Sequence, residues 1–161
     1  MDATLAPAVF TPGSLYIAGF TQARAPHLAL IIPKDNKFGD LVHIRIDRAI
    51  SDNWKFQHRI QKISGDMFLS SLLRIHDISA GPLTVEQLRD AASTVVVPDH
   101  GEFGACSAWV LQVVDELHKR GFVQLSDTAG LAAEIDAFAT GSKAYARRDR
   151  FPNVAASQYC S

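Results

Sequence analysis

The stretch GACSAWVLQVVDEL, residues 104–117, has the apolar spacing of an amphipathic helix that begins close to a cysteine. The residues that follow Cys106 at steps of four, seven, eight and eleven are Val110, Val113, Val114 and Leu117. These steps share one face of a helix with about 3.6 residues per turn. They predict that Cys106 lies in the first turn and faces the protein. The helix dipole and unpaired backbone N–H groups would favour a thiolate there. Cys106 is therefore a candidate nucleophile, and the alternative is a buried structural thiol.

Five apolar runs precede this helix and are typical of β-strands. They cover residues 14–20, 27–33, 41–48, 54–63 and 67–75. The third run, LVHIRIDR, alternates between apolar and polar residues, as a strand with one buried face does. Short turns such as residues 34–39 (KDNKFG) separate the runs and predict a largely antiparallel sheet of four to five strands.

Helical signals follow the strands. Thr84 and Gln87 have the spacing of a capping box that opens a helix, and residues 128–147 carry the apolar spacing of a last helix. Strands followed by helices predict an α+β domain, in which the sheet packs against the cysteine-bearing helix and two further helices. We expect a single catalytic-like domain over residues 1–148 and a loose C-terminal tail over residues 149–161.

Composition narrows the class of protein. The chain has 161 residues, 47% hydrophobic and 20% charged, with a net charge of −1, which favours neither nucleic acid nor an anionic membrane as a partner. The longest apolar run, residues 28–33, is too short to span a bilayer. Cys106 and Cys160 lie far apart, which fits a reduced, cytoplasmic protein. We expect a small-molecule substrate, no cofactor, no metal ion and no transmembrane segment, and the composition leaves the oligomeric state open.

A thiol nucleophile needs a base, and the chain has six histidines. His118 is excluded because it lies about 18 Å along the helix axis from Cys106. His27 opens the most apolar strand, and His43 lies on the polar face of the next strand. Neighbouring strands are ~4.8 Å apart, so these two side chains can meet if the register permits. His100, in the loop before Cys106, is the rival candidate for the base.

These residues also carry a family resemblance. The run His27-Leu28-Ala29-Leu30-Ile31-Ile32, the second histidine His43 and the later Cys106-Ser107-Ala108-Trp109-Val110 resemble the circularly permuted papain-like thiol enzymes. This is the NlpC/P60-type branch that includes lecithin–retinol acyltransferase. The order His, His, Cys is the one that permutation produces. Leu28 stands where the family usually has an aromatic residue, and Ala105 where it has Asn. The resemblance covers roughly residues 14–121, and small fungal proteins of unassigned function are similar over the same span.

The resemblance implies a catalytic triad of Cys106 as nucleophile, His27 as general base and His43 as the residue that orients it. It implies a small cysteine-dependent enzyme that acts on an acyl or carbonyl centre as a hydrolase, acyltransferase or cyclase, and a fungal natural product is a substrate class by analogy. Trp109, Trp54 and His100 are the candidate substrate-binding residues. Two alternatives stay open: a histidine acid–base isomerase or cyclase, and a papain-like module that binds without catalysis.

Overall fold

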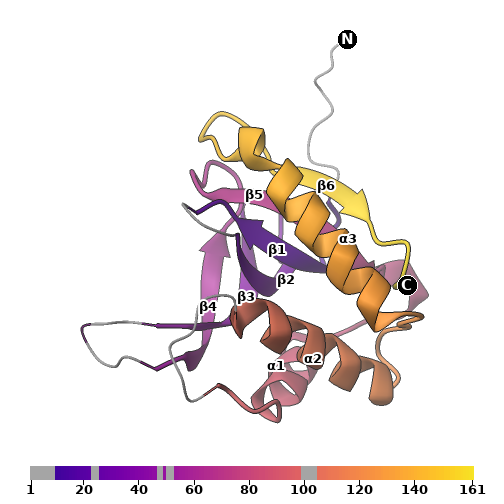
Figure 1. Ribbon diagram of the computed structural model, residues 1–161. Helices are drawn as coiled ribbons and strands as arrows, with labels where there is room; N and C mark the ends of the chain where they lie inside the picture. Colours follow the sequence, from indigo (N-terminus) through magenta and orange to yellow (C-terminus); the bar gives the residue numbers. More distant parts are fainter. Residues whose placement is uncertain (1–9, 23–25, 47–48, 50–52, 99–104) are drawn as a thin grey trace.

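The computed structural model describes residues 10–22, 26–46, 49, 53–98 and 105–161. It is an α+β fold built on one six-stranded sheet with the strand order β4-β3-β2-β1-β5-β6 (Figure 1). The strands are β1 (Leu15–Phe20), β2 (His27–Pro33), β3 (Phe38–Arg45), β4 (Lys55–Lys62), β5 (Leu69–His76) and β6 (Asn153–Ala156). All neighbouring pairs are antiparallel except β5 and β6, which are parallel. The sheet is therefore mixed.

The two neighbours of β2 follow it for different lengths. The pairing of β2 with β1 continues to His27, which lies opposite Phe20. The pairing of β2 with β3 runs from Pro33 only as far as Leu30, opposite Val42. The first residues of β2 are thus hydrogen-bonded to β1 on one side, while β3 parts from them on the other.

Three helices pack mainly on one face of the sheet (Figure 1). They are α1 (Val85–Ser93), α2 (Ala105–Lys119) and α3 (Thr128–Gly141), and 3-10 turns occur at η2 (Ile78–Ala80) and η3 (Lys143–Tyr145). The predicted capping box is confirmed: Thr84 Oγ1 accepts from Gln87 N–H, and Gln87 Oε1 accepts from Thr84 N–H. Helix α2 packs on β2 and β3, and α3 packs on β5 and β1.

The two faces of the sheet bury separate apolar clusters. The helix-side cluster joins one face of β1, β2, β3 and β5 to the inner faces of the three helices, and it includes Leu28, Cys106 and Trp109. The opposite cluster, which includes Phe20 and Ala29, belongs mainly to the strands. Successive residues of a strand point to opposite faces. His27 and Leu28 therefore direct their side chains toward different clusters.

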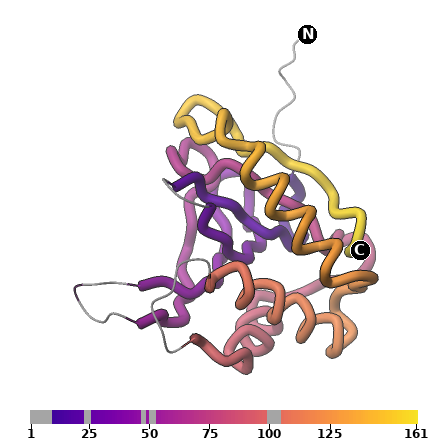
Figure 2. Tube along the Cα trace, viewed as in Figure 1, coloured from indigo at the N-terminus to yellow at the C-terminus, as the bar shows by residue number. Residues whose placement is uncertain are grey.

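The C-terminal segment is the main departure from the predicted fold. The expectation of a loose tail over residues 149–161 is wrong, because β6 lies there and adds a sixth strand beside β5. The chain then returns along α3 (Figure 2), where Gln124 and Ser161 exchange two backbone hydrogen bonds. Helix α3 ends at Gly141, short of the predicted residue 147. In the described part of the chain, no helix is both long and apolar enough to cross a membrane.

Candidate active site

Three side chains form a continuous hydrogen-bonded series across β2, β3 and β4. His27 Nε2 lies 2.8 Å from His43 Nδ1, and His43 Nε2 lies 2.8 Å from Gln57 Oε1. His43 and Gln57 are direct cross-strand partners in the β3–β4 register. The side chain of His27 reaches His43 where β2 and β3 part, and their rings meet edge to face. The contact expected between the two histidines is present, and Gln57 extends it.

Burial keeps both imidazoles neutral at pH 7. Desolvation, followed by the charges of Arg59 and Arg45, lowers the pKa of His27 to about 4. Desolvation also dominates for His43 and lowers its pKa to about 3, against the opposing effect of the Gln57 hydrogen bond. Charging either ring would take an imidazolium into a poorly solvated site beside two guanidinium groups.

The neutral series fixes the tautomer of each histidine. Gln57 Oε1 can only accept, so His43 Nε2 must carry the proton and His43 Nδ1 must accept. His27 Nε2 is then the donor to His43, which leaves His27 Nδ1 with an unprotonated lone pair. The neutral amide of Gln57 at one end of the series thus keeps His27 Nδ1, at the other end, unprotonated and basic.

Backbone N–H groups favour the negative form of the Cys106 sulfur. The N–H groups of Leu28, of Ser107 and of Cys106 itself each lower the pKa of the thiol. Leu28 is the residue that follows His27 in β2, and both Leu28 and Cys106 belong to the helix-side cluster.

The expectation that Cys106 favours the thiolate does not match the structure. Burial raises the pKa of the Cys106 thiol and outweighs the three backbone N–H groups that lower it. Cys106 is only 5% exposed, so the loss of hydration exceeds what the start of α2 returns. The resting state that follows is a neutral thiol beside a neutral histidine pair, rather than a thiolate–imidazolium ion pair.

A pocket of about 520 Å³ opens onto the histidine pair. Its wall includes aromatic residues and two arginines, and the described residues that line it are Phe20, Thr21, Gln22, His27, His43, Arg45, Ile46, Trp54, Arg59, Asp66 and Phe68. Cys106 is not among them. Both histidines of the pair therefore contact the space that a small molecule can enter, and Cys106 does not line the described part of that space.

The structure separates the three candidate substrate-binding residues. Trp54 lines the pocket, and its indole Nε1 is buried with no hydrogen-bond partner in the described ranges. Trp109 is 1% exposed, packs against Phe56 in the helix-side cluster and is not among the described residues that line the pocket. It falls three residues after Cys106, on the same inner face of α2. His100 lies outside the described residues.

The remaining described histidines have other partners away from the pocket. His58 Nε2 lies 3.0 Å from an Asp40 carboxylate oxygen, and His76 Nε2 donates to the Gly81 carbonyl at 2.7 Å. His118 Nδ1 accepts from the Leu125 N–H at 3.2 Å. Among residues 10–22, 26–46, 49, 53–98 and 105–161, no three His, Cys, Asp or Glu side chains are grouped so as to hold a metal ion.

Gln57 is the member of the site that the sequence prediction lacked. It lies in the run KFQHRIQK, where Gln57, Arg59 and Gln61 alternate with other residues and so share one face of β4. The β3–β4 register that places it opposite His43 is a long-range pairing, which the local sequence pattern does not determine. The alternation along β4 could have shown that Gln57 shares a face with Arg59 and Gln61, but not that His43 lies opposite it.

No protein-family model matches this chain, and neither a curated protein nor a solved structure is similar to it.

Proposed function

We propose that the protein is a cysteine-dependent enzyme of the permuted papain-like type that acts on an acyl or carbonyl carbon of a small molecule in the cytoplasm. The observation that carries the proposal is the series Gln57–His43–His27. It ends in a basic nitrogen on His27, and the N–H of the next residue, Leu28, favours the negative form of the Cys106 sulfur. A thiol nucleophile needs a base, and that base needs a third group to orient it. The proposal assigns these roles to His27 and His43.

In the proposed reaction, Cys106 is deprotonated only as it attacks. The S–H proton moves to His27 Nδ1 while the sulfur forms a bond to the carbonyl carbon and the carbonyl π pair moves to oxygen. The backbone N–H of Cys106 stabilises this oxyanion. Collapse of the intermediate expels the leaving group, which takes the proton from His27. Water or another nucleophile then cleaves the thioester. Because the resting thiol is neutral, the rate depends on the base in the transition state.

The test is whether Cys106 becomes acylated. The protein is incubated with activated p-nitrophenyl esters of different chain lengths, and intact-mass spectrometry follows adduct formation in a Cys160→Ser background. We expect an acyl adduct at Cys106 that turns over in the wild type. It should accumulate more slowly by about 10²-fold or more in His27→Gln. Ester turnover that persists in Cys106→Ala would contradict the proposal.

One observation favours a second candidate function. The pocket wall contains His27 and His43 but not Cys106, so a substrate can meet the histidines without touching the sulfur. The alternative is histidine acid–base catalysis, such as an isomerisation or cyclisation, with His27 Nδ1 as the base and Cys106 as a bystander. Turnover of a substrate that survives Cys106→Ala and fails in His27→Gln would select this alternative.

A further inference from the structure

The pocket carries an excess of positive charge. Two of the side chains that line it, Arg45 and Arg59, are cations, and one, Asp66, is an anion. His27 and His43 add no charge at pH 7, because burial holds their pKa values near 4 and 3. The balance of charge on the described wall is therefore positive, next to the basic nitrogen of His27.

The carboxylate of Asp66, the one acidic side chain among the described lining residues, already accepts from N–H donors. Asp66 Oδ1 accepts from the backbone N–H groups of Phe68 and Leu69 at 2.8 Å, and its Oδ2 accepts from Gln61 Nε2 at 3.0 Å. In the described ranges, no salt bridge joins Asp66 to either pocket arginine. Its charge holds the β4–β5 connection in place.

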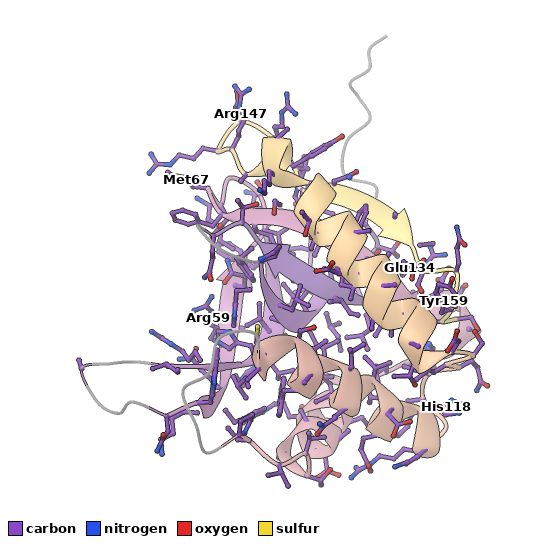
Figure 3. All side chains as sticks on the ribbon, viewed as in Figure 1. Arg59, Met67, His118, Glu134, Arg147 and Tyr159 are labelled. Atoms are coloured by element: carbon purple, nitrogen blue, oxygen red, sulfur yellow. The ribbon has the colours of Figure 1, made fainter. Side chains whose placement is uncertain are left out.

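Arg59 is held in position by a neutral group. Its Nη2 donates to Gln61 Oε1 at 2.7 Å, and Gln61 is fixed in turn by Asp66 and by the Lys62 carbonyl. The Arg59 guanidinium can donate five hydrogen bonds, and the contact with Gln61 uses only part of this capacity. Because Gln61 is neutral, the contact leaves the positive charge of Arg59 uncompensated. Figure 3 shows Arg59 projecting from β4. The side chain is therefore oriented, and no other acceptor among the described residues takes its remaining donors.

The two arginines oppose each other. Desolvation and then the charge of Arg45 lower the pKa of Arg59, while the charge of Asp66 has a smaller, opposite effect. The two guanidinium groups therefore lie within electrostatic reach, and Asp66 offsets only part of their repulsion. Such an arrangement costs stability in the empty protein. An anion between the two groups turns the repulsion into paired attraction, and guanidinium groups match the planar oxygens of carboxylates and the oxygens of phosphates.

We propose that Arg45 and Arg59 bind an anionic oxygen group of the substrate, a carboxylate or a phosphate, beside His27. The assignment of this group to a substrate, and its place next to the acyl carbon, rest on the proposed function. The anion site itself does not.

Binding is tested without any reaction. Isothermal titration of the full chain at low ionic strength uses succinate, inorganic phosphate and uncharged succinamide. We expect succinate or phosphate to bind and succinamide to fail, and the preferred anion identifies the group. Arg59→Gln should weaken binding roughly tenfold or more, since it removes a charge-assisted contact. Arg59→Lys should recover part of the affinity, because it keeps the charge but not the fork.

The control for net charge is Arg147→Gln. Arg147 pairs with Asp149 at 2.8 Å on the surface and does not line the pocket. It should leave affinity unchanged, and Arg45→Gln replaces Arg59→Gln if the latter does not fold. The absence of binding by both anions, or equal losses in the Arg59 and Arg147 variants, would overturn the anion site.

A second readout separates the anion site from the reaction. In Cys160→Ser protein, the rates of Cys106 alkylation by anionic iodoacetate and neutral iodoacetamide are compared. We expect the ratio of iodoacetate to iodoacetamide rates to fall roughly tenfold in Arg59→Gln and to stay unchanged in Arg147→Gln. A ratio that does not respond to Arg59 counts against placing the anion next to the carbon that Cys106 attacks. If Cys106 reacts with neither reagent while an anion still binds through Arg59, the proposed function fails and the anion site stands.

Discussion

Two histidines, His43 on β3 and His58 on β4, each form a hydrogen bond to a side chain of the other strand. The two contacts differ in the chemical group that the imidazole ring meets. On one face, His58 meets the carboxylate of Asp40 at 3.0 Å. On the other face, His43 meets the neutral amide of Gln57 at 2.8 Å and passes the contact on to His27. The Val42–His58 and His43–Gln57 pairs are adjacent in the register, so their side chains alternate between faces.

The difference shows what the amide contributes. A carboxylate beside an imidazole favours its protonated form, whereas an amide oxygen fixes a tautomer without adding charge. In the buried series, a charged His43 would donate from both nitrogens. His27 Nε2 would then have to accept, and His27 Nδ1 would carry a proton and lose its basicity. The neutral partner therefore keeps the base of the proposed enzyme available.

Removal of the middle residue should have the largest effect. His43→Leu leaves His27 without an acceptor for its Nε2–H and leaves the half-buried Gln57 without its partner. We expect ester turnover to fall on the order of 10²–10³-fold, as for loss of general-base function. The rate of p-nitrophenyl ester turnover in the wild type and in His43→Leu measures this loss. His58→Leu is the matched control in the other pair, and an equal loss in that variant would show that the comparison carries no catalytic meaning.

A change of partner type should move the pH dependence. Gln57→Glu places a carboxylate on His43 and raises its pKa from about 3. We expect the acid limb of the pH–rate profile, set in the wild type by the pKa of His27 near 4, to move toward neutral pH. At pH 6 the rate should fall roughly tenfold relative to pH 8 in this variant only. Identical profiles for wild type and Gln57→Glu would mean that His43 does not control the base.

The neutral pair should also make the fold sensitive to acid. The pKa values of His27 and His43 are about 4 and about 3 in the folded protein, against 6.5 ordinarily, so the unfolded chain binds protons more readily. Their contribution to stability is complete above pH 6.5 and is lost as pH falls toward 3. We expect the free energy of unfolding in urea to drop by roughly 3 to 6 kcal/mol between pH 6.5 and pH 4. A His27→Gln/His43→Leu double variant should lose much less over this range, and parallel curves would refute the explanation.

The carboxylate pair should matter least. Asp40→Asn removes the charge opposite His58, whose side chain is 23% exposed. We expect less than about 1 kcal/mol of lost stability, because the amide oxygen of the asparagine can still accept a hydrogen bond from His58. Thermal unfolding and ester turnover of this variant should match the wild type closely. A turnover defect as large as that of His43→Leu would contradict the account, because it would indicate that catalysis depends on the face of the sheet that carries Asp40 and His58.

The sequence predicts the strongly patterned parts of this fold. The apolar run of β2, the capping box of α1 and the inner face of α2 each depend on local spacing, and the structure has them. Strand β6 is not visible because NVAA is short and follows a charged loop, and its parallel place beside β5 is a tertiary effect. The protonation state of Cys106 was predicted with the wrong sign, since spacing indicates the helix start but not how deeply the sulfur is buried.

The most direct test is the rate at which Cys106 reacts with iodoacetamide between pH 5 and pH 10 in Cys160→Ser protein, with and without His27. The account predicts a wild-type thiol that reacts at pH 7 at least roughly tenfold faster than in His27→Gln, where reaction should await ionisation above the free-cysteine range of about 8.5. His58→Gln should follow the wild type. Equal rates with and without His27 across the whole pH range would contradict the claim that this histidine is the base for Cys106.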